Sequence, residues 1–261
     1  MATIRKAKTL GRELLKKYFK HGEIPTENHF SSLIDSMLNK QDDGFSKDDR
    51  NGFILSASPE AGRFITLYET MDDQAPFFVL EKDNHESGGV KLTPGNPEGL
   101  GDSQQGSIYF HTNGNLGIGK RSLGEHRVEV QGFAGMDGRA GTYRKGSVPA
   151  NGKWHSIVKR LDNCQAFEIV ARTGTKSSGK FAIVHAIAMR ALGKSHGRIR
   201  RTGAHYGFFW NKIKLRWHVL DNHQYELQIK TNSNYGPDVN VYYHVCKLWD
   251  DEIFLPEEYY F

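Results

Sequence analysis

The sequence predicts a mainly β protein with N-terminal α-helices, in which a glycine-rich β segment precedes a C-terminal antiparallel β-sandwich. Glycine provides 28 of the 261 residues, about 11% against a usual ~7%, which favours turns over helix interiors. Helical periodicity ends near residue 45, and short apolar runs between turn residues follow it. We therefore divide the chain into a helical region (1–45), a short-strand β segment (46–135), a glycine-rich linker (136–153) and a β-sandwich domain (154–261).

Two amphipathic helices are expected in the helical region. The first, around Leu10 to Phe19, is strongly basic and suits docking on an acidic protein; a solvated terminal helix, a membrane-surface helix and a transit peptide are the alternatives. The second starts at Pro25 and Thr26 and is expected to end at Gly44. Its apolar stripe consists of Phe30, Leu33, Ile34, Met37 and Leu38. Because so narrow a stripe is marginal alone, this helix must pack on another copy or on the chain's own β domain.

The middle segment is predicted to form brief strands between turns. The runs are Phe53–Ser56, Arg63–Glu69, Phe77–Lys82, Val90–Thr93, Ser107–Thr112 and Arg127–Gln131. A loop rich in proline and glycine, from Pro94 to Gly101, interrupts them. Strands this short cannot close a core alone, so we expect the missing surface to come from a second or third copy of the chain.

Longer strands are predicted after the linker. They are Trp154–Arg160, Gln165–Arg172, Phe181–Ala191, Lys212–Val219, Tyr225–Thr231 and Val239–Leu248. Three of these runs alternate apolar and polar residues, which is typical of antiparallel sheets with one wet face. Such strands within about 110 residues indicate a sandwich or jelly roll. The run Phe181–Ala191 is apolar enough for a buried helix, but its flanking glycines favour a strand.

The net charge of +5 is unevenly distributed. Lys/Arg against Asp/Glu number seven to one in residues 1–22, twelve to nineteen in 23–150 and sixteen to ten in 151–261, giving +6, −7 and +6. Residues 169–220 contain eleven Lys/Arg and no acid. The candidate contact residues in this stretch are Arg198, Arg200, Arg201, Tyr206 and Trp210. A solvated loop, an acidic protein neighbour, an anionic glycan and nucleic acid all fit this pattern, and nucleic acid is not expected as the partner.

Motifs for chemistry are incomplete throughout the chain. The string from Gly114 to Arg121 resembles a phosphate-binding loop, but Arg121 replaces the hydroxyl residue and a strand follows instead of a helix. The twelve histidines form no HExxH or HxH motif, there is no GxSxG, and Cys164 and Cys246 have no near partner. We expect no enzyme activity, cofactor or metal. The absence of a signal-peptide pattern and of an 18-residue apolar run predicts cytosolic synthesis without a membrane span.

Residues 106–132 carry the string GSIYFHTNGNLGIGK and, after four residues, EHRVEVQG. This string resembles the strand, glycine turn and strand unit of phage tail fibres and related adhesins. The resemblance implies a homotrimer, with Gly114, Asn115, Gly117 and Gly119 as the trimerisation turn. Lys120, Arg121 and Ser122 stand where that family has a Thr/Pro stretch, whereas Val128 and Val130 keep its alternating strand.

The C-terminal region is similar to accessory tail proteins of contractile injection systems. The strings that carry this resemblance are GKWHSIVKRLDNCQAFEIVARTG, KFAIVHAIAM, NKIKLRW, YELQIKTNSNYG and YYHVCKLW, together with the helix FSSLIDSMLNKQDDGFS. It implies a structural subunit at the baseplate, its cage or its fibres, anchored by the second helix, contacting other baseplate or tail proteins and extracellular after release. The alternative is a receptor-binding adhesin whose sandwich binds an anionic cell-surface glycan.

Overall fold

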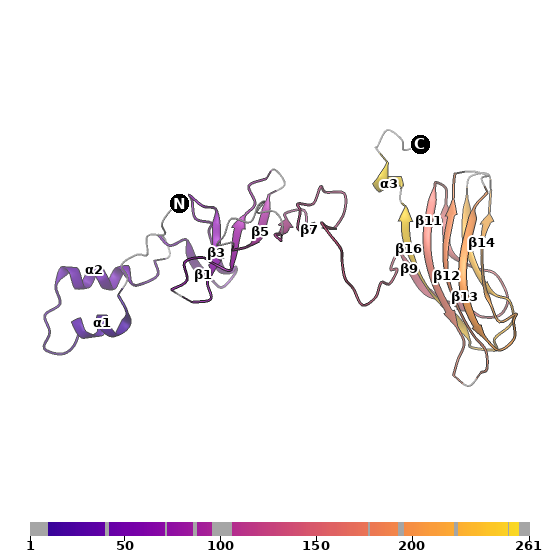
Figure 1. Ribbon diagram of the computed structural model, residues 1–261, viewed down its shortest axis with the longest axis horizontal. Helices are drawn as coiled ribbons and strands as arrows, with labels where there is room; N and C mark the ends of the chain where they lie inside the picture. Colours follow the sequence, from indigo (N-terminus) through magenta and orange to yellow (C-terminus); the bar gives the residue numbers. More distant parts are fainter. Residues whose placement is uncertain are drawn as a thin grey trace. The chain divides into compact units, whose positions relative to one another are not determined.

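The chain divides into two compact units, Met1–Ala134 and Gly135–Phe261. The computed structural model in Figure 1 describes residues 10–39, 42–70, 72–85, 88–95, 106–176, 178–192, 196–221, 224–249 and 251–255. Unit 1 holds two helices, a hairpin and one sheet, and unit 2 holds two sheets and a short helix. The molecule is mainly β, as the sequence predicts.

The two N-terminal helices form a hairpin. Helix α1 is Arg12–Tyr18 and α2 is Glu27–Asp35, which is capped by Thr26 and His29 in a capping box. The helix α2 ends at Asp35, so the expected end at Gly44 is wrong. Its continuation is lost because Ser36 bonds with its side chain to the Ser32 carbonyl and to the Leu10 amide, at 2.7 and 3.2 Å, and short polar side chains compete with the helix in this way.

A β-hairpin follows the helices. Strand β1 is Phe45–Asp48 and β2 is Gly52–Leu55. The Asp48 carboxylate closes the turn by accepting hydrogen bonds from the Arg50 and Asn51 amides, and Gly52 adopts a positive φ of 69°. The sequence predicts β2 but not β1, because FSKD contains a single apolar residue.

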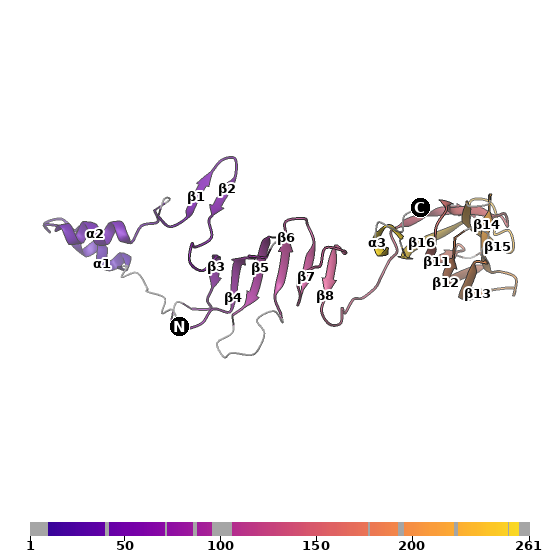
Figure 2. The same cartoon turned by 90° about the horizontal axis from the view of Figure 1, so that it is seen from above.

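The remaining strands of unit 1 form one six-stranded sheet in chain order, seen side by side in Figure 2. The strands are β3 (Arg63–Leu67), β4 (Phe78–Lys82), β5 (Gly89–Pro94), β6 (Ile108–His111), β7 (Leu116–Ile118) and β8 (Val128–Val130). Neighbours are antiparallel except β7 and β8, which are parallel. Strand β7 lies inside the glycine string that the sequence presents as a turn.

Unit 2 is a sandwich of two antiparallel sheets (Figure 1). The strand order is β13-β12-β11-β16-β9 in the five-stranded sheet and β10-β15-β14 in the three-stranded sheet. Their bounds are β9 Arg144–Pro149, β10 His155–Leu161, β11 Gln165–Thr173, β12 Phe181–Arg190, β13 Arg198–Tyr206, β14 Ile213–Val219, β15 Tyr225–Thr231 and β16 Asn240–Trp249, followed by α3 Asp251–Phe254. The predicted antiparallel sandwich is confirmed.

The core of unit 2 lies between the two sheets. Its centre is formed by side chains with almost no exposed surface, including Phe167, Ile169, Leu227, Ile229 and Val245. On β12 the residues alternate in burial: three alanines, Val184 and, at the end of the strand, Arg190 are buried, whereas the isoleucines, His185 and Met189 are exposed. This strict alternation confirms the strand over the buried-helix alternative.

Two edge strands of the five-stranded sheet depart from the sequence interpretation. Strand β9, with the sequence RKGSVP, lies in the predicted linker and pairs with β16, so the linker does not extend to residue 153. Strand β13 lies where no strand is predicted and pairs with β12. Both carry few apolar side chains, because an edge strand is held mainly by its backbone ladder.

Candidate functional site

One face of the β3–β8 sheet is apolar across all six strands. Cross-strand partners and alternate residues place twelve apolar side chains on it: Ile65, Leu67, Phe78, Leu80, Val90, Leu92, Ile108, Phe110, Leu116, Ile118, Val128 and Val130. We call this surface the apolar face. Six of these side chains are exposed, from 38% for Ile65 to 56% for Val128. Pro94 shares the face, and Lys82 lies at its margin.

The opposite face of the same sheet is polar and covered by the chain that links β7 and β8. Arg121 forms a bidentate ion pair with the buried Asp83, at 2.8 and 3.0 Å, and its guanidinium lies 5.2 Å from the centre of the buried Tyr109 ring. Lys120 pairs with Glu129 at 2.8 Å. The two basic residues that depart from the tail-fibre pattern therefore close this face.

Hydrogen bonds and charges on the polar face favour its carboxylates in the ionised form. The Lys120 ammonium and the Ser122 hydroxyl lower the pKa of Glu129 to about 2. The Arg121 guanidinium likewise lowers the pKa of Asp83. Both carboxylates are structural partners of the linking segment, and neither is held in the protonated form that a general acid needs at neutral pH.

The four residues of the predicted trimerisation turn make contacts within one chain. Gly114 turns with a φ of +83°, and Asn115 is buried, where its side chain bonds to Gly124 and Arg127. A Cβ atom on Gly117 would lie 2.2 Å from the Lys120 carbonyl oxygen, so this position requires glycine. Gly119 has a φ of +73°. Their local role is to shape the β6–β7 turn and strand β7.

The apolar stripe predicted for the second helix is largely uncovered in the described part of the chain, and its last two residues, Met37 and Leu38, lie beyond the end of α2. Phe30, Ile34, Met37 and Leu38 are more than half exposed, and Leu33 is half-buried. Phe30 meets Phe19 edge-on at 5.3 Å between ring centroids. The contacts of α1 thus leave most of the predicted attachment stripe open.

The five candidate contact residues of the basic stretch do not form one site. Arg198, Arg200 and Arg201 lie at the start of β13, whereas Tyr206 ends this strand and Trp210 follows it. Arg200 and Tyr206 are six positions apart, which is about 20 Å at the rise of an extended strand. The structure therefore separates a cationic strand from an aromatic turn.

The aromatic turn, residues 207–211, presents Phe208, Phe209 and Trp210 to solvent. Phe208 stacks parallel to Trp210 at 4.7 Å between ring centroids, and Phe209 packs edge-on against Trp210 at the same distance. The turn is stabilised on its buried side by Asn211, which has no exposed surface. Its side chain donates to the Tyr206 carbonyl and accepts from Ser233, at 3.2 and 3.0 Å.

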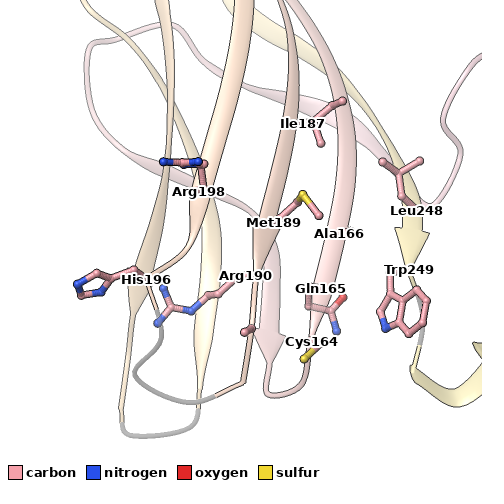
Figure 3. A pocket seen from close by; sticks show the side chains of 11 residues that line it. Cys164, Gln165, Ala166, Ile187, Met189, Arg190, His196, Arg198, Leu248 and Trp249 are labelled. Atoms are coloured by element: carbon pink, nitrogen blue, oxygen red, sulfur yellow. The ribbon is translucent and has the colours of Figure 1, made fainter. Parts of the chain in front are cut away.

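An open groove of about 560 Å³ crosses the outer face of the five-stranded sheet at one end. Its apolar lining comes from Ala166, Ile187, Met189, Leu248 and Trp249, on strands β11, β12 and β16. Figure 3 shows Met189 and Ile187 between Arg198 on one side and Leu248 and Trp249 on the other. A groove with this lining fits an apolar ligand that carries an anionic group. Sequence patterns alone did not reveal it.

The described residues contain little that resembles a catalytic or metal centre. No three His, Cys, Asp or Glu side chains among them are grouped to hold a metal ion. Glu168 accepts from Arg139 and contacts His185 at 2.9 Å, and these contacts lower the pKa of Glu168, His185 contributing most. Cys164 and Cys246 are free thiols. In the described part of the chain, no helix is long and apolar enough to cross a bilayer.

Comparison with known proteins gives a weak structural likeness. No protein-family model matches the chain, and no curated protein matches it. Among solved structures, the tailspike protein of Acinetobacter phage vB_ApiP_P1 is similar over 48% of this chain and 27% of its own, with 8% identity and a TM-score of 0.28. The match thus spans about a quarter of the tailspike's length. A likeness of this size carries no inference about activity or partners.

Proposed function

We propose that this chain is a non-enzymatic structural subunit of a contractile phage-tail-like particle, at its baseplate, cage or fibres, and that it assembles as a homotrimer. The observation that carries the proposal is the apolar face of the β3–β8 sheet. A single sheet with an uncovered apolar face is not stable in water, because the apolar face must be buried against a second layer. Another copy of the same sheet supplies that layer.

Self-association is favoured by the composition of the apolar face. The face has no charged side chain within its area, so two or three copies meet without burying an unpaired charge. Burial of each of its six exposed side chains contributes on the order of 1 kcal/mol, about half of the ~1.5–3 kcal/mol for a large aliphatic side chain. The face as a whole supplies several kcal/mol per copy. The glycine string beside it resembles fibre proteins, and this favours three copies.

The remaining parts of the proposal follow from the other open surfaces. The exposed stripe from Phe30 to Leu38 is suited to anchoring on a larger particle, and the cationic strand β13 is suited to an acidic neighbour. Nothing in this scheme requires turnover, and we expect none on glycan or peptidoglycan substrates. Sheath, tube and baseplate genes beside the gene for this chain would support the assignment to a particle, and their absence would argue against it.

Light scattering of the full chain tests the oligomeric state. At micromolar concentration we expect three times the chain mass of 29.5 kDa. The double variant Phe110→Glu/Val128→Glu places charge on the apolar face and should give monomers. The control Val170→Glu alters an exposed apolar residue of unit 2 and should stay trimeric. A monomeric wild-type chain would overturn the proposal.

The aromatic turn supports a second candidate, a receptor-binding adhesin for an anionic glycan. Sugar rings pack on exposed aromatic faces, and Lys212 directly follows the turn. A glycan array should show binding that Trp210→Ala removes. The control Trp249→Ala changes a tryptophan of the distant groove and should leave binding intact. A blank array with the wild-type chain would reject this candidate.

A further inference from the structure

Strand β13 is an unprotected edge of the five-stranded sheet. It runs for nine residues, and β12 is its only strand partner among the described residues, so its other side presents backbone amides and carbonyls to solvent. Every residue of it is exposed except the half-buried Ile199. An edge of this length is a template for one more strand.

The charges on β13 determine which strand it accepts. Arg198 and Arg200 lie on the outer face, because they are the cross-strand partners of Met189 and Ile187. They are two residues apart, about 7 Å along the strand. Among the described residues, no carboxylate lies within ion-pair distance of either guanidinium, and the whole stretch from residue 169 to 220 contains no acid.

Arg201 lies on the other side of the edge. Its cross-strand partner is the buried Ala186, and its guanidinium donates to the Ile213 carbonyl at 3.4 Å. Three arginines within four residues repel a second copy of β13, which is how natural edge strands avoid pairing with themselves. The same charges attract a strand of opposite sign, so the three arginines both disfavour pairing with another β13 and favour pairing with an acidic strand.

We propose that β13 accepts an extended acidic segment of a partner protein, which joins the sheet beside it as a sixth strand. Main-chain hydrogen bonds to the open edge supply affinity. Acidic side chains at alternate positions of the segment face Arg198 and Arg200 at cross-strand distance. The groove lined by Met189 lies beside Arg198 on the same outer face and receives an apolar side chain of the segment that reaches over the edge.

Single-stranded nucleic acid is the alternative anionic ligand that must be distinguished from an acidic peptide strand. Its binding combines cations with aromatic rings on which bases stack. Here the arginines and the aromatic turn lie at opposite ends of β13, about 20 Å apart. The open backbone edge has no role in nucleic-acid binding, whereas strand addition uses it along its whole length. The structure therefore favours the peptide.

A synthetic strand of nine alternating Thr and Glu residues, labelled with a fluorophore, tests the proposal with the full chain. Anisotropy at low salt should show binding, and Arg198→Gln/Arg200→Gln should weaken it at least tenfold. The control Lys145→Gln/Arg172→Gln removes two exposed cations from other strands of the same sheet and should change binding less than twofold. Hydrogen exchange should show new protection in β13 when the peptide is bound.

Backbone methylation separates strand addition from charge attraction. The same peptide with alternate backbone nitrogens methylated keeps its charge but cannot complete a ladder, and it should bind at least tenfold more weakly. The proposal would be overturned if the methylated and unmethylated peptides bound equally, or if the full chain did not bind the peptide at all. It would also be overturned if the control variant lost as much peptide affinity as the arginine variant, or if a poly-dT oligonucleotide bound as tightly as the peptide. Strand addition concerns unit 2 alone, so its failure leaves the trimer proposal for the apolar face intact.

Discussion

Replacing Arg121 by Gln tests whether the linking segment holds the β3–β8 sheet through its ion pair. Arg121 donates to both oxygens of Asp83, and Asp83 is only 3% exposed. Gln at this position is too short to reach the carboxylate with two donors. The substitution therefore leaves a buried charge without its partner.

The cost follows from the burial of the two groups. Removing one partner of a fully buried pair costs about 3–5 kcal/mol. The Arg121 side chain is 32% exposed, so water screens part of the interaction, and we expect a loss of about 2–3 kcal/mol. Asp83→Asn in the same chain removes the stranded charge, so the double variant should lose only about 1 kcal/mol.

Hydrogen exchange measures this loss where it occurs. All four tryptophans, Trp154, Trp210, Trp217 and Trp249, belong to unit 2, so tryptophan fluorescence follows that unit alone and serves as the internal control. Amides of β4 to β7 should lose protection in Arg121→Gln, while unit 2 unfolds as before. A change below about 0.5 kcal/mol in β4 to β7, or a double variant as unstable as the single one, would refute the reasoning.

Three further predictions address other parts of the chain. The pKa of Glu129 is about 2, below its ordinary value, so this carboxylate stabilises unit 1 at neutral pH, and the stabilisation is lost as pH falls from about 4.5 to about 2; thermal unfolding by circular dichroism should show this slope, and Glu129→Gln should flatten it. Gly117→Val forces a side chain onto the Lys120 carbonyl and should destabilise unit 1 by at least ~2 kcal/mol, measured by hydrogen exchange, whereas Gly135→Ala, in open space, should be neutral. Phe167→Ala empties a fully buried position of the sandwich and should cost about 3–5 kcal/mol in urea unfolding followed by tryptophan fluorescence; a loss below 1 kcal/mol would contradict the core described above.

Strands with a periodic apolar pattern could be predicted from the sequence, and strands held by their neighbours could not. The alternation of apolar and polar residues in β14, β15 and β16 predicts these strands directly. In β15 the expected wet face is wrong, because Glu226 and Gln228 on that face are also buried. Strand β13 has a single apolar side chain directed to the core, Ile199, and its remaining residues resemble a solvated loop. Its ladder with β12 overrides that local preference.

The candidate surfaces depended on register, which a single sequence does not determine. Each strand of the apolar face is too short to indicate which side is buried, and the face appears only when Leu80, Leu92, Ile108, Ile118 and Val130 are aligned across the sheet. The basic and aromatic residues near position 200 are close in sequence, but an extended strand keeps them apart. Residues that are close in sequence can form one site when they lie in a loop, whereas in an extended strand the same residues can lie too far apart to share a site.

The hydrogen bonds of Asn211 determine the shape of the aromatic turn, and they do not depend on which side chains the turn exposes. Asn211 and Ser233 fix the backbone from inside the sandwich, and Phe208, Phe209 and Trp210 take no part in those bonds. We therefore expect replacement of the three rings to cost the sandwich little stability. Residues 208–210 can therefore vary in sequence while the sandwich stays constant, as loops do on a rigid frame.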